Sequence, residues 1–171
     1  MAVATKKIRR RRHTDELVVE QTRDLPAVAR MLAAAGRFAE GIGAPGGCYL
    51  LAHVGSAVAG VIGIEARVDA ALVRSLFVAA PMRGREIGAA LIAAARTAAH
   101  TRGVRVLYAL APDADTAGYL ERFGFASSAM DTMLAALAGT FVVEYLRARP
   151  DELARYRALA LDIARDGLII R

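Results

Sequence analysis

Alternating apolar and polar positions divide the first part of the chain into a strand and an amphipathic helix. Leu17–Thr22 is rich in Val and Leu and predicts the first strand. A helix capped by Thr22 or Asp24 should follow, because Pro26 then falls in its first turn, where a missing N–H costs nothing. Glycine and proline recur through residues 36–47 and predict an irregular connector.

The next apolar runs predict a hairpin and then a central strand. Residues 48–54 and 57–66 flank the turn Gly55-Ser56, which is typical of a β-hairpin. Residues 71–78 are apolar at nearly every position, so we expect a strand covered on both faces of a sheet. Simple alternation would place Val73 and Phe77 on one face, and on the other Leu72, Leu76 and Val78.

The following segments have the order of a parallel crossover. Helical spacing of apolar and alanine residues predicts a helix over about residues 85–102. Residues 104–110 predict a second buried strand, which should run parallel to the central one because a helix joins them. A short helix capped by Asp113 or Asp115 should then run to Gly124.

The C-terminal third predicts mainly helices. The apolar spacing favours a helix ending at Gly139, a strand over residues 141–145 and a last amphipathic helix from Pro150 to Gly167. The inward face of that last helix would carry Leu153, Tyr156, Leu159 and Ile163. Together the elements predict a single α/β domain with a mixed sheet, helices on both faces and a helical C-terminal extension.

Composition bounds the class of protein and places the excess charge at one end. The 171 residues, 56% hydrophobic and 23% charged, fit one globular domain over residues 14–171. No apolar run approaches the ~20 residues that span a bilayer, and the single Cys48 suits a reducing cytoplasm. Residues 1–13 carry six Lys and Arg and no acid, which leaves 17 basic and 17 acidic side chains elsewhere. We expect a disordered arm there; nucleic-acid binding is the weaker alternative, since no aromatic residue is interleaved with the charges.

One stretch has the chemistry of an anion site. An apolar strand ends near Val78, an Arg/Gly turn follows, and a helix begins at once. The first N–H groups of that helix lack partners and lie at the positive end of its dipole. Arg83 and Arg85 add charge, while Gly84 and Gly88 let a ligand approach the backbone. The expected ligand is a phosphate or pyrophosphate.

The same stretch resembles a family motif. The GNAT superfamily of N-acetyltransferases has a loop (Gln/Arg)-x-x-Gly-x-(Gly/Ala), similar to Arg83-Gly84-Arg85-Glu86-Ile87-Gly88. In that family the loop holds the pyrophosphate of acetyl-coenzyme A (acetyl-CoA), so the resemblance assigns residues 83–89, ending at Ala89, to the cofactor. Glu86 departs from the usual Gly. It could still present its N–H if its φ were negative, and its carboxylate should point away from the phosphates.

A second motif strengthens the resemblance. Tyr119-Leu120-Glu121-Arg122-Phe123-Gly124-Phe125 is similar to the family's Tyr-Glu-(Lys/Arg)-x-Gly-Phe, and it follows the loop after a helix and a strand. The two motifs imply the GNAT fold, a mixed and mostly antiparallel sheet, most clearly over residues 17–126. The family closes with two antiparallel strands, so a helical tail would be a departure.

The resemblance also implies a reaction, the transfer of acetyl from a thioester to an amine. A backbone N–H near Phe77 or Val78 would polarise the thioester carbonyl. The family's acidic tyrosine would stand at Leu120. Tyr119, about 100° round the helix, is therefore either a core aromatic or a substitute acid. Glu65 is the remaining candidate base, with surface solvation as the alternative.

Arg74 and Ser75 occupy the middle of the central strand, where the family often has an acid. A charge there needs a partner. Arg74 is either part of a structural ion pair or, with Ser75, binds an anionic group of the substrate. The segment 72–76 is also similar to acetyltransferases of arsenic-resistance gene clusters.

These observations predict an acetyl-CoA-dependent N-acetyltransferase that acts on the amine of a small molecule or an amino acid. The alternatives are a CoA-binding sensor or scaffold that has lost its acid and base, or a protein that binds nucleic acid through the basic arm. No metal is expected, because His13, His53 and His100 lack ligand spacing. A homodimer is compatible with the late strand and terminal helix.

Overall fold

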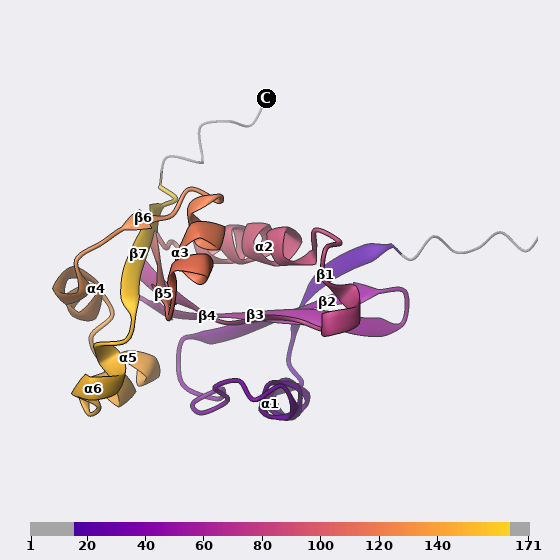
Figure 1. The fold of residues 1–171 in the computed structure, drawn as a ribbon, viewed down its shortest axis with the longest axis horizontal. Helices are drawn as coiled ribbons and strands as arrows, with labels where there is room; N and C mark the ends of the chain where they lie inside the picture. The colour runs from indigo at the N-terminus through magenta and orange to yellow at the C-terminus, as the bar shows by residue number, and fades with distance from the viewer. Residues whose placement is uncertain (1–15, 165–171) are drawn as a thin grey trace, which may run out of the picture.

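The computed structural model describes residues 16–164, so the basic arm lies outside the described residues. Its centre is a seven-stranded sheet in the order β1-β2-β3-β4-β5-β7-β6 (Figure 1). Among the strands described, only β4 and β5 pair in parallel, and the other neighbouring strands are antiparallel. The predicted single α/β domain with a mixed, mostly antiparallel sheet is thereby confirmed.

The N-terminal strands follow the apolar runs closely. The bounds are β1 Leu17–Thr22, β2 Gly47–Val54, β3 Ala57–Arg67 and β4 Ala70–Val78. β2 and β3 form the predicted hairpin, and Gly55 in its turn has a φ of 59°, a value that glycine adopts without strain. Most of β2, β3 and the first half of β4 is buried, because helices cover both faces of the sheet.

Two of the predicted helices cover opposite faces (Figure 1). α1, Leu25–Ala34, is capped by Asp24, whose Oδ1 accepts from the Ala27 N–H at 3.0 Å. α2, Ile87–Thr101, lies on the other face and buries Ile87, Leu91, Ile92, Ala95 and Ala99. α3, Ala114–Glu121, lies on the α2 side and is capped by Asp113, which accepts from the Thr116 N–H at 2.7 Å.

β4 contains a bulge that corrects the predicted division of its faces. Val61 lies opposite Phe77 and Gly63 lies opposite Arg74, so β4 has one residue more than β3 between these pairs. Ser75, within the bulge, has a φ of 59°. Because of the extra residue, Ala71, Val73, Leu76 and Val78 all pack on the α2 side, whereas Leu72 and Phe77 pack on the opposite face.

The sheet opens beside this bulge. β5, Val106–Ala111, pairs with β4 only through Ala70–Val73, and its remaining residues pair with β7 alone. The second half of β4 and the end of β5 therefore diverge. Side chains from both strands line the space between them.

The C-terminal predictions are partly wrong. The predicted helix is α4, Met130–Ala136, but the predicted strand at 141–145 is helix α5, Phe141–Arg147. The predicted last helix is a four-residue α6, Pro150–Leu153, followed by strand β7, Arg157–Asp162. β7 forms because β5 offers an open edge along its whole length, and β6, Ala126–Ser127, adds on its far side. The described chain thus ends in a strand, and its helices form an insertion between β6 and β7.

Candidate functional site

The loop after β4 borders a hollow of about 430 Å³, called here the loop cavity. Its lining is Leu76, Val78, Met82, Arg83, Gly84, Glu86, Ile87, Gly88, Ala89, Tyr119, Arg122 and Phe123. Most of the predicted cofactor residues therefore meet in one place, but Arg85 and Phe77 do not line it. Leu76, Met82, Arg122 and Phe123 were not predicted. Arg122 and Phe123 lie within the second motif, which was the available signal.

The loop presents the start of α2 to this cavity. The short 3₁₀ helix Ala80–Met82 is followed by exposed residues 83–86, and buried Ile87 anchors the first turn of α2 in the core. The Arg83 Nε donates to the Val78 carbonyl at 3.3 Å. Glu86 is the N-cap residue with a φ of 60°, so the condition of a negative φ, under which it would present its N–H, is not met. The free N–H groups of the first turn make this a suitable anion site.

Gly88 lies in close contact with a side chain of the protein itself. A Cβ on Gly88 would overlap the hydroxyl of Tyr119, which lies over the first turn of α2. The Tyr119 ring packs edge-on against Phe123, with centroids 5.1 Å apart. Tyr119 is therefore held at one wall of the loop cavity.

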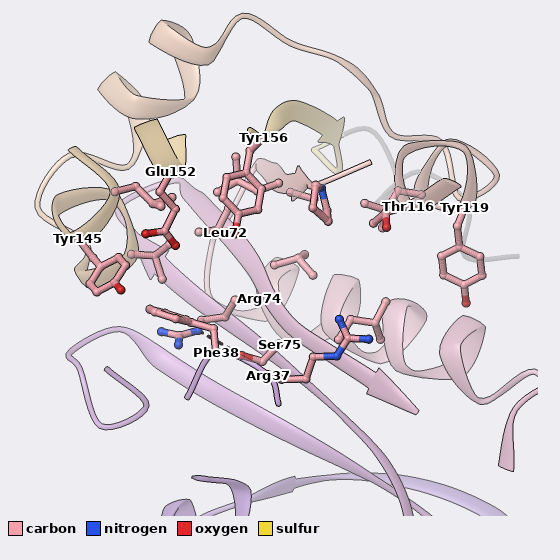
Figure 2. Close-up of a pocket in the computed structure, with 18 of the residues that line it drawn as sticks. Arg37, Phe38, Leu72, Arg74, Ser75, Thr116, Tyr119, Tyr145, Glu152 and Tyr156 are labelled. Atoms are coloured by element: carbon pink, nitrogen blue, oxygen red, sulfur yellow. Dashed lines mark hydrogen bonds between the residues drawn. The ribbon is translucent and has the colours of Figure 1, made fainter. Parts of the chain in front are cut away.

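A second hollow of about 510 Å³, called here the aromatic cavity, fills the space where β4 and β5 diverge (Figure 2). Its polar lining consists of Arg37, Arg74, Ser75, Thr116 and Glu152. Its rings belong to Phe38, Tyr119, Tyr145 and Tyr156. Leu76 and Tyr119 line both cavities, so the two hollows adjoin at these side chains.

The structure confirms that Arg74 is part of a structural ion pair, and Arg74 also lines the aromatic cavity. Its side chain is buried, with Nη1 3.5 Å from Glu65 Oε2. Nη2 donates to the Glu40 carbonyl at 2.6 Å, and Nε donates to Ser75 Oγ at 3.4 Å. Nη1 makes an ion-pair contact with Glu65 but no hydrogen bond to it or to another described residue. One donor of a buried cation is thus left without a protein acceptor.

One interpretation of the sequence placed Glu65 on the surface, but the structure buries this residue. It is 1% exposed and does not line the aromatic cavity. Its carboxylate accepts from the N–H of Phe141 and, at 3.4 Å, from that of Val142. These are free donors at the start of α5, so Glu65 binds this helix end to β3 and pairs with Arg74. Its observed contacts are structural.

Tyr119 and Leu120 have different surroundings. Leu120 is buried in the core and reaches the aromatic cavity, where it offers no proton. Burial raises the pKa of the Tyr119 phenol, Arg122 opposes the rise, and Glu86 adds to it. The Tyr119 hydroxyl therefore stays protonated at neutral pH and can donate a proton where the two cavities adjoin.

Sequence reasoning missed Arg37, Tyr145, Glu152 and Tyr156 as cavity residues. Arg37 follows α1, whereas the others belong to the insertion and to the turn before β7. No local pattern marks them, because only the pairing of β7 with β5 brings that segment over the cavity. Within residues 16–164 no cluster of three or more His, Cys, Asp or Glu has metal-site geometry. None of the helices described has the length and apolarity to cross a bilayer.

Comparison with known proteins agrees with this architecture. Residues 45–127 match the family model described as an acetyltransferase (GNAT) domain. The structure of Rv2747 from Mycobacterium tuberculosis, in complex with CoA, is similar at a TM-score of 0.65 and 15% identity, over 85% of this chain and 98% of that one. The ribosomal-protein-S18-alanine N-acetyltransferase from Escherichia coli is similar at a TM-score of 0.63 and 15% identity, over 91% of this chain and 99% of that one. A GNAT-family acetyltransferase from Staphylococcus aureus is similar at a TM-score of 0.64 and 13% identity, over 86% of this chain and 99% of that one. No curated protein matches the sequence.

Proposed function

We propose that this chain, whose residues 45–127 match the model of an acetyltransferase (GNAT) domain, is an acetyl-CoA-dependent N-acetyltransferase for the amine of a small molecule or an amino acid. One observation carries the proposal: the loop cavity and the aromatic cavity adjoin at Leu76 and Tyr119. The loop cavity has the groups to hold a pyrophosphate, and the aromatic cavity can enclose an acceptor amine. The thioester would lie between them. The arsenic-resistance subgroup remains an expectation from sequence.

The cofactor would occupy the loop cavity. The N–H groups at the start of α2 and the side chains of Arg83 and Arg122 would hold the pyrophosphate. Arg85 would add long-range attraction from the exposed loop. Leu76 and Val78 supply an apolar wall for the pantetheine arm. The bound cofactor would supply an activated acetyl group and a thiol leaving group.

The protein would assist the transfer mainly by position. The backbone N–H groups of Phe77 and Val78, after the bulge, are proposed to polarise the thioester carbonyl. Tyr119 would donate its proton to the departing sulfur, which makes it the catalytic acid in place of Leu120. The contacts of Glu65 give it no access to the acceptor, so we do not assign it the base.

The acceptor would lie in the aromatic cavity. Arg74 and Ser75 form part of its wall, so the guanidinium of Arg74 could meet a carboxylate or another anionic group of the acceptor. Because Glu65 already balances the charge of Arg74, this contact would be chiefly a hydrogen bond.

Calorimetric titration with acetyl-CoA tests the cofactor site. The wild type should bind with a Kd in the micromolar range, and the double variant Arg83→Glu, Gly88→Asp should lose binding, because two carboxylates would repel the phosphates and fill the space at Gly88. Release of free thiol with an amine then separates an enzyme from a sensor. Absence of binding to the wild type would refute both. Binding without thiol release across a broad amine panel would favour the sensor.

A further inference from the structure

Glu152 is the acidic side chain among the described residues that line the aromatic cavity. β7 pairs with the end of β5 through Arg157 and Ala111, so the residues just before β7 lie over that end. In α6 the Glu152 N–H donates to the Arg149 carbonyl at 3.0 Å, which helps fix the backbone. Figure 2 shows Glu152 and Tyr156 reaching into the cavity, with Arg74 and Phe38 across from them.

The carboxylate of Glu152 is available for a ligand. The residue is partly buried, and its side chain makes no hydrogen bond or ion pair with another residue in the range 16–164. The charge of Glu152 acts on Tyr156: burial raises the pKa of the Tyr156 phenol, and the negative charge of Glu152 raises this pKa further. Arg149, which borders the same segment, instead donates to the Tyr145 carbonyl at 3.0 Å and lies over the Tyr145 ring.

We propose that Glu152 binds the protonated amine of the acceptor and takes up the proton that this amine must lose. The inference rests on the proposed acetyltransferase function and narrows its substrate class. The acceptor would be a primary alkyl amine, which is an ammonium ion at neutral pH, attached to an apolar or aromatic body that fits between Phe38, Leu72 and Tyr145.

The chemistry of the step balances with one proton released. The ammonium gives a proton to the Glu152 carboxylate, directly or through one water, and the amine nitrogen then forms a bond to the thioester carbon. The carbon–sulfur bond breaks, its electron pair stays on sulfur, and the thiolate is protonated by Tyr119. The second proton lost from nitrogen passes to solvent, and the proton held by Glu152 returns to the Tyr119 phenolate through water, which restores both residues. The products are an N-acetyl amide, a free thiol and one proton.

Calorimetry with two probes of the same shape tests the binding role. Phenethylamine is cationic and phenethyl alcohol is neutral, and each is titrated into the full-length protein with and without saturating CoA. The wild type should bind the amine about tenfold to a hundredfold more tightly than the alcohol. Glu152→Gln should remove this advantage and leave alcohol binding unchanged, whereas Glu152→Asp should retain part of it. Asp151→Asn, a change of the neighbouring carboxylate on the same helix, should behave as the wild type.

Equal binding of the two probes by the wild type overturns the inference without need of a variant. An amine advantage that survives Glu152→Gln also overturns it. The proton role requires in addition that Glu152→Gln lower kcat for phenethylamine at saturation by about a hundredfold or more, and an unchanged kcat refutes that role. Failure of CoA binding or of thiol release would refute the proposed function instead, and the comparison of the two probes would stand independently.

Discussion

Replacement of Glu86 by glycine should stabilise the protein and strengthen cofactor binding. Glu86 has a φ of 60°, in a region where a residue with a Cβ is strained by roughly 1 kcal/mol. Glycine adopts this conformation freely but loses more entropy on folding, so we expect a net gain of about 0.5 kcal/mol. For a domain of this size that corresponds to a rise in Tm of about 1–2 °C.

The charge contributes separately from the backbone. Glu86 is exposed and lines the loop cavity, so removal of its carboxylate should tighten acetyl-CoA binding by up to about fivefold at low salt. Glu86→Ala is the matched control, because it removes the charge and keeps the strained φ. Thermal unfolding and calorimetry of both variants separate the two effects. A glycine variant no more stable than the alanine variant would refute the argument from strain, and unchanged affinity in both would mean that the carboxylate points away from the phosphates.

Two further variants test the buried pair and the proposed acid. Glu65→Gln should lower the free energy of unfolding by about 3 kcal/mol in urea titration, because it leaves the buried charge of Arg74 uncompensated. The double variant Glu65→Gln, Arg74→Met should regain part of this loss. A loss below about 1 kcal/mol in the single variant would contradict the assigned role. Tyr119→Phe should slow thiol release by about tenfold or more without changing the Kd for acetyl-CoA, and an unchanged rate would exclude the hydroxyl as the acid. Because burial raises the pKa of Tyr119, its acid form persists as the pH rises to about 10, so this residue should cause no loss of wild-type activity below that pH.

Much of the fold and of the loop cavity could be predicted from the sequence, because these parts depend on local chemistry. The hairpin at Gly55-Ser56, the cap at Asp24 and the turn before α2 each depend on residues close together in the chain. Such signals need no knowledge of distant partners. The same holds for the predicted anion site, since α2 begins within the stretch that forms it.

Contacts between distant segments decided the rest. The bulge at Ser75 exchanges the faces of β4, and its position is defined only by pairing with β3. Residues 157–162 satisfy either a helical or a strand pattern, and the open edge of β5 selects the strand because its backbone groups need partners. That pairing brings Glu152 over the aromatic cavity. Likewise, Glu65 is a structural residue because α5 begins beside it, 76 positions later in the chain.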